Sequence, residues 1–205
     1  EGACFTEQIE NYGLPNFAEY GKKRPAGFDP GLEYNAWLEY CWDTILEFCE
    51  MAFQMNKYEG YDISEYIPMI ESSVKFFDEH YQYLAKRRGS KALDGNGKLV
   101  LFPGSACETF KMAYNSTPTV TGLRVVTQSL IDYHKDDTIK VSQYKALLNR
   151  IPEISTRIVD GKEVIAPAAL WERVNNTENP MLYPVFPWRM YGVGRDNLQL
   201  AVDTY

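Results

Sequence analysis

The stretch GKLVLFPGSACETFKM, residues 97–112, contains the features around which we interpret the rest of the chain. A turn sequence, DGNG at 94–97, leads into a short apolar run, which Pro103-Gly104 interrupts. Small residues then lead directly to Glu108. A carboxylate beside small residues and a Pro-Gly break can lie close to the backbone in a partly desolvated place, which is the setting that a general acid needs.

A second stretch, VDGKEVIAP at 159–167, repeats the order of turn, lysine, short β-like run and proline. Glu172 follows Pro167 by five positions, as Glu108 follows Pro103. Two similar connections therefore predict two carboxylates at one cleft. The alternative is that both are ordinary turn connections with an incidental glutamate, since 28 of the 205 residues are acidic.

Apolar residues at three- and four-residue steps predict helices over about 32–56, 63–88, 119–133 and 138–150, and a last helix from about Asp196. We expect Pro68 to kink the second helix and the Gly- and Pro-rich residues 1–30 to form a long loop. The order is helical hairpin, glutamate loop, helical hairpin, glutamate loop, with a period of roughly 65 residues. Such repeats bury their faces by closing a ring or by stacking as a solenoid.

Charge and composition narrow the function classes. The net charge of −7 argues against nucleic acid, whose binding needs clustered Lys and Arg. No apolar run reaches the length of a bilayer span, so we expect no transmembrane helix. The four cysteines lack CxxC spacing, and only two histidines are present. Buried thiols are therefore expected, rather than a metal site or a nucleophile triad.

The string KLVLFPGSACET, residues 98–109, resembles the acid-bearing loop of six-hairpin glycosidases, in particular the α-L-fucosidase-type enzymes of glycoside hydrolase family ninety-five. The segment YIPMI at 66–70 resembles the helix ahead of that loop, and residues 178–194 are similar to a related family of unassigned function. The resemblance covers nearly the whole chain. It implies a mainly α fold over residues 1–205, the later part of an (α/α)6 toroid whose earlier hairpins lie upstream.

The resemblance also implies an inverting glycosidase that needs no cofactor, acts on an oligo- or polysaccharide and is periplasmic or secreted. Glu108 takes the position of the general acid. The base lies in the next loop beside a tryptophan, where this chain has Trp171-Glu172 and, further on, Glu178. The equal offset from proline favours Glu172 as base, and Glu178 remains the alternative. Inversion requires about 6.5–9.5 Å between the two carboxyl groups.

Four further residues are candidates for substrate binding, each with a structural alternative. Trp171 and Tyr183 would stack on sugar rings or fill the core. Asn179 would hydrogen-bond a sugar hydroxyl or shape the turn before a proline, and Arg189 would hold a carboxylate or cap a helix. The fucosidases have a His-Arg-His-type segment where this chain reads NPMLY at 179–183, so fucose specificity is not implied.

Asp43 lies in a strongly apolar segment, which places it at the cleft end of a helix or in a set of hydrogen bonds. Two other functions remain open. One is a carbohydrate-binding or structural domain without a complete acid/base pair, and the other is a helical-repeat interaction module. A close carboxyl pair in an aromatic cleft would favour the enzyme.

Overall fold

The computed structural model describes residues 40–205, of which 46% are helical and 13% are in strands or bridges. None of the helices in this part of the chain has the length and apolar character needed to cross a bilayer. The elements, in chain order, are α1 (Thr44–Glu59), α2 (Ile67–Arg87), β1 (Gly104–Ala106), β2 (Phe110–Ala113), α3 (Thr117–Tyr133), α4 (Thr138–Arg150), β3 (Thr156–Val159), β4 (Lys162–Ile165), β5 (Arg173–Val174), a 3-10 turn (Pro180–Leu182) and α5 (Leu198–Thr204).

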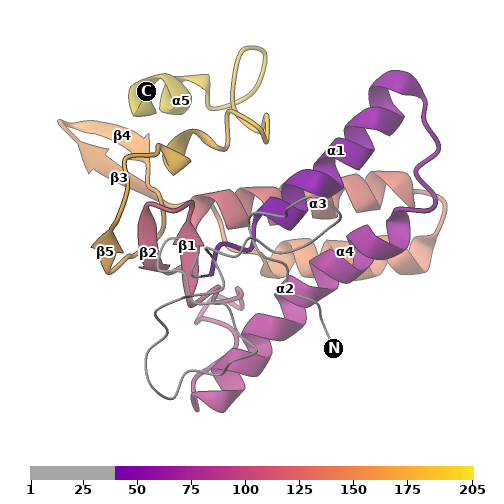
Figure 1. Cartoon of the computed structure of the whole chain (residues 1–205), viewed down its shortest axis with the longest axis horizontal. Helices are drawn as coiled ribbons and strands as arrows, with labels where there is room; N and C mark the ends of the chain where they lie inside the picture. Colours follow the sequence, from indigo (N-terminus) through magenta and orange to yellow (C-terminus); the bar gives the residue numbers. More distant parts are fainter. Residues whose placement is uncertain (1–39) are drawn as a thin grey trace, which may run out of the picture.

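The predicted fold class, a mainly α toroid of repeated hairpins, is wrong. The described chain is mixed α/β, with two small antiparallel sheets that lie with α5 to one side of α1–α4 (Figure 1). The two loops that looked alike in sequence fold differently. The β1–β2 hairpin follows Pro103, whereas the β3–β4 hairpin ends before Pro167. The two halves of the chain are therefore not equivalent units.

The helix predictions fare better, because a period of 3.6 is a strong local signal. The helix predicted over 138–150 is α4, and the predictions for α2 and α3 differ from the structure by a few residues at their starts. Pro68 lies in the first turn of α2, where a missing N–H costs nothing, so no kink is needed. The first predicted helix begins only at Thr44, and residues 1–39, including the expected loop over 1–30, lie outside the described part.

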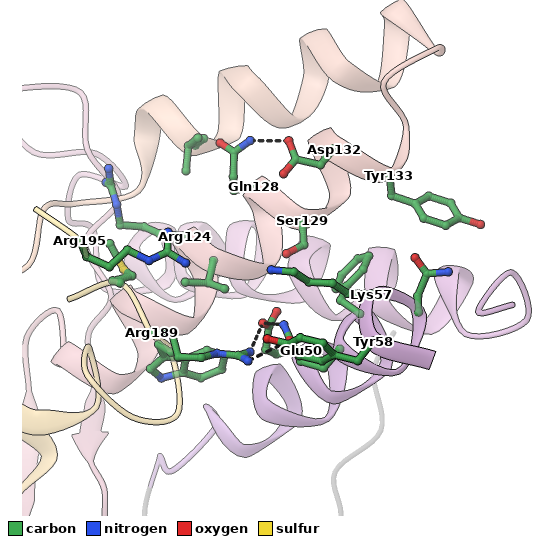
Figure 2. A pocket seen from close by; sticks show the side chains of 17 residues that line it. Glu50, Lys57, Tyr58, Arg124, Gln128, Ser129, Asp132, Tyr133, Arg189 and Arg195 are labelled. Atoms are coloured by element: carbon green, nitrogen blue, oxygen red, sulfur yellow. Dashed lines mark hydrogen bonds and ion pairs between the residues drawn. The ribbon is translucent and has the colours of Figure 1, made fainter. Parts of the chain in front are cut away.

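The segment after the 3-10 turn is fastened to α1 by Arg189. Its guanidinium donates through Nη2 to Glu50 Oε1 at 2.8 Å and through Nη1 to Gln54 Oε1 at 2.8 Å (Figure 2). Gln54 in turn hydrogen-bonds the Glu50 carboxylate. Arg189 therefore forms an ion pair with a buried carboxylate, which was one of its two predicted roles.

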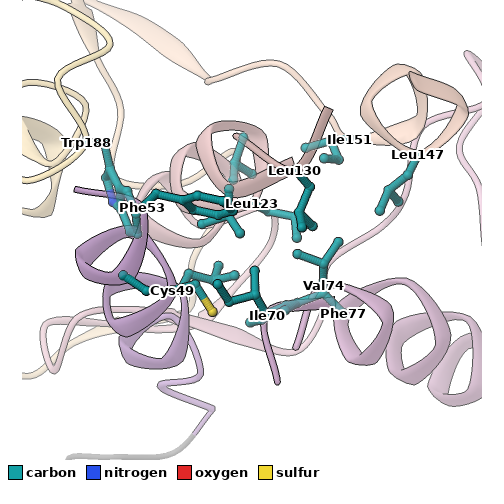
Figure 3. Packing of buried hydrophobic residues seen from close by; sticks show 14 of the residues in the cluster. Cys49, Phe53, Ile70, Val74, Phe77, Leu123, Leu130, Leu147, Ile151 and Trp188 are labelled. Atoms are coloured by element: carbon teal, nitrogen blue, oxygen red, sulfur yellow. The ribbon is translucent and has the colours of Figure 1, made fainter. Parts of the chain in front are cut away.

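Trp188, next to this anchor, closes the main hydrophobic core (Figure 3). The core is formed where α1, α2 and α3 meet, and its members include Leu46, Cys49, Phe53, Ile70, Val74, Phe77, Leu123, Val126 and Leu130. The outer face of α1 is only partly covered, since Phe48 and Met51 are 56% and 50% exposed. Of the three cysteines in the described part of the chain, Cys49 and Cys107 are buried thiols, as expected, whereas Cys41 is only partly buried.

Close packing of Trp188 depends on a glycine in α3. A Cβ atom at Gly122 would lie 2.5 Å from Cζ2 of the Trp188 ring, well inside contact distance. The absence of a side chain at this position therefore lets the C-terminal segment approach the helix.

We expect Gly122→Ala to lower the free energy of unfolding by about 1–2 kcal/mol, because overpacking outweighs the better helix propensity of alanine. Urea denaturation measures the change. Gly95→Ala is the matched control, since nothing lies within 4 Å of a Cβ there. A Gly122→Ala variant as stable as the parent would contradict this packing.

Candidate functional site

Glu108 lies at the tip of the β1–β2 hairpin, in the three-residue loop between the paired residues Ala106 and Phe110. Cys107, which opens the loop, has a φ of 52°, an uncommon conformation for a residue with a side chain. The Cys107 and Thr109 side chains are buried, while Glu108 is half-buried. The tip thus holds one carboxylate between two inward-facing residues.

A second segment reaches the same tip because β5 pairs with β2, Phe110 opposite Val174 and Lys111 opposite Arg173. The Asn175 amide continues the ladder by donating to the Thr109 carbonyl at 2.8 Å. Asn176 then donates from Nδ2 to Glu108 Oε2 at 3.0 Å. A pairing of two residues thereby brings residues 175–178 alongside Glu108.

Glu178 completes the connection. Its Oε2 accepts a hydrogen bond from the Glu108 amide at 2.9 Å and another from the Thr109 hydroxyl at 2.9 Å. The Glu178 amide donates back to Thr109 Oγ1 at 3.2 Å. The carboxylates of Glu108 and Glu178 therefore belong to one hydrogen-bonded loop pair, although 70 residues separate them in sequence.

Glu172 does not join this group. Its amide donates to the Lys111 carbonyl at 3.0 Å, and its side chain is 65% exposed, with Arg173 Nη1 3.7 Å away. Its neighbour Trp171 packs edge-to-face on Phe110 with ring centroids 5.3 Å apart. The Arg157 guanidinium lies 5.8 Å from the Trp171 ring centroid. Glu172 and Glu108 therefore lie in different surroundings, although each follows a proline by five positions.

Two acids at the start of α1, the buried Asp43 and the half-buried Glu47, lie close to the hairpin tip and Tyr183. Asp43, at the start of α1, is 3% exposed, and burial raises its pKa to about 6 despite the opposing effect of the Lys111 charge. Burial, with the neighbouring charge of Asp43, raises the pKa of Glu47 to about 7. Asp43 also accepts a weak hydrogen bond from the Cys41 thiol at 3.8 Å. Asp43 thus lies at the end of α1 beside the hairpin tip, which was the first of its two predicted settings.

The side chains around these acids connect α1 to the sheet. Lys111 of β2 is fully buried and donates to Ser105 Oγ at 3.1 Å and to the Cys107 carbonyl at 3.3 Å. The Cys107 thiol is hydrogen-bonded to Tyr183. Burial and the charges of Asp43 and Glu47 raise the pKa of both Cys107 and Tyr183, so all four side chains share one low-dielectric region.

The remaining predicted residues divide between two places. Tyr183 is half-buried at this cluster, whereas Arg189 lies further along α1 with Glu50. Asn179 is exposed, directly after Glu178, and its carbonyl accepts from the Leu182 amide at 3.0 Å. Sequence reasoning did not assign Glu47, Thr109, Lys111 or Asn176.

The site is therefore a set of four carboxyl groups, Asp43, Glu47, Glu108 and Glu178, around Cys107 and Tyr183. Within residues 40–205 no three His, Cys, Asp or Glu side chains are grouped closely enough to hold a metal ion. What the arrangement offers is proton transfer, because two of its acids have a pKa of about 6 and 7.

Comparisons of the chain with protein-family models, with curated proteins and with solved structures gave no match.

Asp43 predicts a pH dependence of stability with a defined sign. The ordinary pKa of its carboxyl group is 3.8, and in the folded protein it is about 6. Between these values the folded state holds a proton that the unfolded state has lost. The free energy of unfolding therefore falls as pH rises, by about 3 kcal/mol over the window.

We expect the parent to lose stability relative to Asp43→Asn from about pH 4 to pH 6, and the difference to become constant only after Glu47, whose pKa the Asp43 charge raises, has also titrated, above about pH 8. Urea denaturation of both proteins at a series of pH values measures the difference. Titrating groups that do not interact with Asp43 are present in both proteins and cancel. A difference that does not change with pH would refute the assignment.

Proposed function

We propose that this protein hydrolyses glycosidic bonds with inversion of configuration, with Glu108 as general acid and Glu178 as general base. The observation that carries the proposal is the joining of the two glutamates at one hairpin tip through the Glu108 amide and the Glu178 carboxylate. The resemblance of residues 98–109 to the acid-bearing loop of six-hairpin glycosidases supports the same role for Glu108. The proposal rests on the site and not on a toroidal fold.

The reaction assigns one step to each carboxyl group. Protonated Glu108 gives its proton to the glycosidic oxygen as the bond to the anomeric carbon breaks. Ionised Glu178 takes a proton from a water molecule, whose oxygen forms the new bond on the opposite face of the sugar. The cycle closes when a proton returns from Glu178 to Glu108 through solvent. Asn176, which donates to Glu108 Oε2, orients the acid.

Glu178 rather than Glu172 is the proposed base because of its surroundings. The Glu108 amide and the Thr109 hydroxyl both donate to Glu178 Oε2, which holds this carboxylate at the hairpin tip that carries Glu108. Its other oxygen, Oε1, is the one proposed to take the proton from water. Both Glu172 and Glu178 are exposed, but Glu172 lies beside Arg173, and its amide bonds the Lys111 carbonyl rather than a residue of the tip.

The two acids at the start of α1 give the site a second proton source. Burial and the Asp43 charge raise the pKa of the half-buried Glu47 to about 7, and Asp43 lies one helical turn before it. We assign both to the environment of the reacting pair and keep Glu47 as the alternative donor. The proposed substrate is an oligo- or polysaccharide, with Tyr183 and the exposed Asn179 placed beside the pair to contact sugar.

We expect the chain to hydrolyse at least one member of an aryl-glycoside panel, with the inverted anomer as first product in ¹H NMR. Glu108→Gln and Glu178→Gln should each lower kcat by about 10²-fold or more. Glutamine keeps an acceptor oxygen for the loop hydrogen bonds, so Glu108→Gln should keep the thermal midpoint of the parent. Glu178→Gln replaces two charge-assisted hydrogen bonds with neutral ones and should lower the midpoint while the chain stays folded.

Glu172→Gln is the matched control and should stay within about twofold of the parent rate, since Glu172 is exposed. Full activity of Glu108→Gln together with loss in Glu47→Gln would transfer the acid role to Glu47. Saturable sugar binding without hydrolysis of any glycoside would identify a carbohydrate-binding domain instead of an enzyme. The hydrogen bonds to Glu178 Oε2 would then only hold the two loops together.

A further inference from the structure

A second polar hollow lies between α1, α3 and the segment that follows Trp188. Its volume is about 640 Å³, within the range of small-molecule sites. It is distinct from the carboxyl cluster, because its acid on α1 is Glu50, two helical turns or about 10 Å beyond Asp43. Nothing in the proposed reaction uses it.

The side chains that line the hollow carry an excess of positive charge. The cations are Lys57, Arg124, Arg189 and Arg195, and the acids are Glu50 and Asp132. This excess stands out in a chain whose net charge is −7. Glu50 is paired with Arg189 at 2.8 Å, and Arg124 is paired with Glu153 at 3.1 Å. Asp132 is hydrogen-bonded by the uncharged Gln128 at 2.8 Å, so Lys57 and Arg195 together exceed its charge by one. The local field therefore favours an anion.

Several donors in the hollow have capacity left. Within residues 40–205, neither Lys57 nor Arg195 lies within 4.0 Å of a carboxylate, and both side chains are exposed. Arg189 makes two side-chain hydrogen bonds with a guanidinium that has five N–H groups. Figure 2 shows Lys57 on one side of the hollow and Arg124 with Arg195 on the other, with the Glu50–Arg189 pair nearby.

We propose that the hollow binds a small polyhydroxylated ligand that carries one anionic group, such as a sugar with a carboxylate, sulfate or phosphate. Lys57 and Arg189 hold the anionic group, which lies beside the Glu50–Arg189 pair. Gln128 and Ser129 on α3 contact hydroxyl groups, and Arg195 adds attraction from the opposite side. Arg189 is kept in place by Glu50 and Gln54, so its remaining donors are preorganised.

Calorimetric titration of the full chain with four probes tests the proposal. The probes are glucuronate, glucose 6-sulfate, glucose 6-phosphate and neutral glucose. We expect at least one anionic sugar to bind at least tenfold more tightly than glucose, and the affinity to fall as salt is raised. The anionic sugar that binds most tightly shows whether the site prefers a carboxylate, a sulfate or a phosphate. Equal affinity for all four probes, or no binding of any of them, overturns the proposal.

Lys57→Gln should weaken binding of the best anionic probe by about tenfold, the loss of one charge-assisted hydrogen bond. Arg195→Gln should weaken it by at least threefold. Both residues are exposed, so neither change should unfold the chain. Lys75→Gln removes an exposed lysine of α2 outside the hollow and should leave affinity unchanged. Full affinity in Lys57→Gln, or an equal loss in Lys75→Gln, would place the ligand elsewhere.

Discussion

The pairing of β5 with β2 is the constraint on which the candidate site depends. Only two residue pairs form it, Phe110 with Val174 and Lys111 with Arg173, and a strand this short is marginal by itself. The Glu178 carboxylate compensates by accepting from the Glu108 amide and the Thr109 hydroxyl. Hydrogen bonds to a charged group contribute about 1.5–3 kcal/mol each, more than the neutral bonds of the ladder. The Glu178 carboxylate thus both holds residues 175–178 against the hairpin tip and is the proposed base, so the local fold and the proposed reaction depend on the same group.

A second constraint lies under the hairpin, where Lys111 and Asp43 are both withdrawn from water. Isolated buried charges are costly, and the attraction between these two reduces the cost for each. Because Lys111 belongs to β2 and Asp43 to the start of α1, their interaction relates the helical part of the molecule to the small sheet. Asp43 and Glu47 are then close to Cys107 and Tyr183, in a region where burial raises the pKa of these side chains.

The sequence predicted the helices well and their arrangement poorly. The apolar stripes of α2, α3 and α4 are local signals, and they gave the elements to within a few residues. The toroid followed from the likeness of two loops together with the resemblance to six-hairpin glycosidases. The two loops are not alike in structure, because strands of two to four residues carry too little sequence pattern to show whether they precede or follow a proline. Glu108 and Glu178 were both candidates, yet the favoured partner was Glu172, since nothing local reveals that β5 pairs with β2. Asn176 and Glu47 gain their places only through contacts distant in sequence.

The Glu108 amide proton offers the most direct measurement of the central claim, that the Glu178 carboxylate binds the hairpin tip. In a ¹⁵N–¹H NMR spectrum we expect this resonance to lie downfield, because the amide donates to the Glu178 carboxylate. In Glu178→Ala, which has no acceptor at this position, the resonance should move upfield, whereas Glu172→Ala should leave it in place. A Glu108 amide that keeps its position in Glu178→Ala would show that the two loops are not joined and would remove the basis of the site.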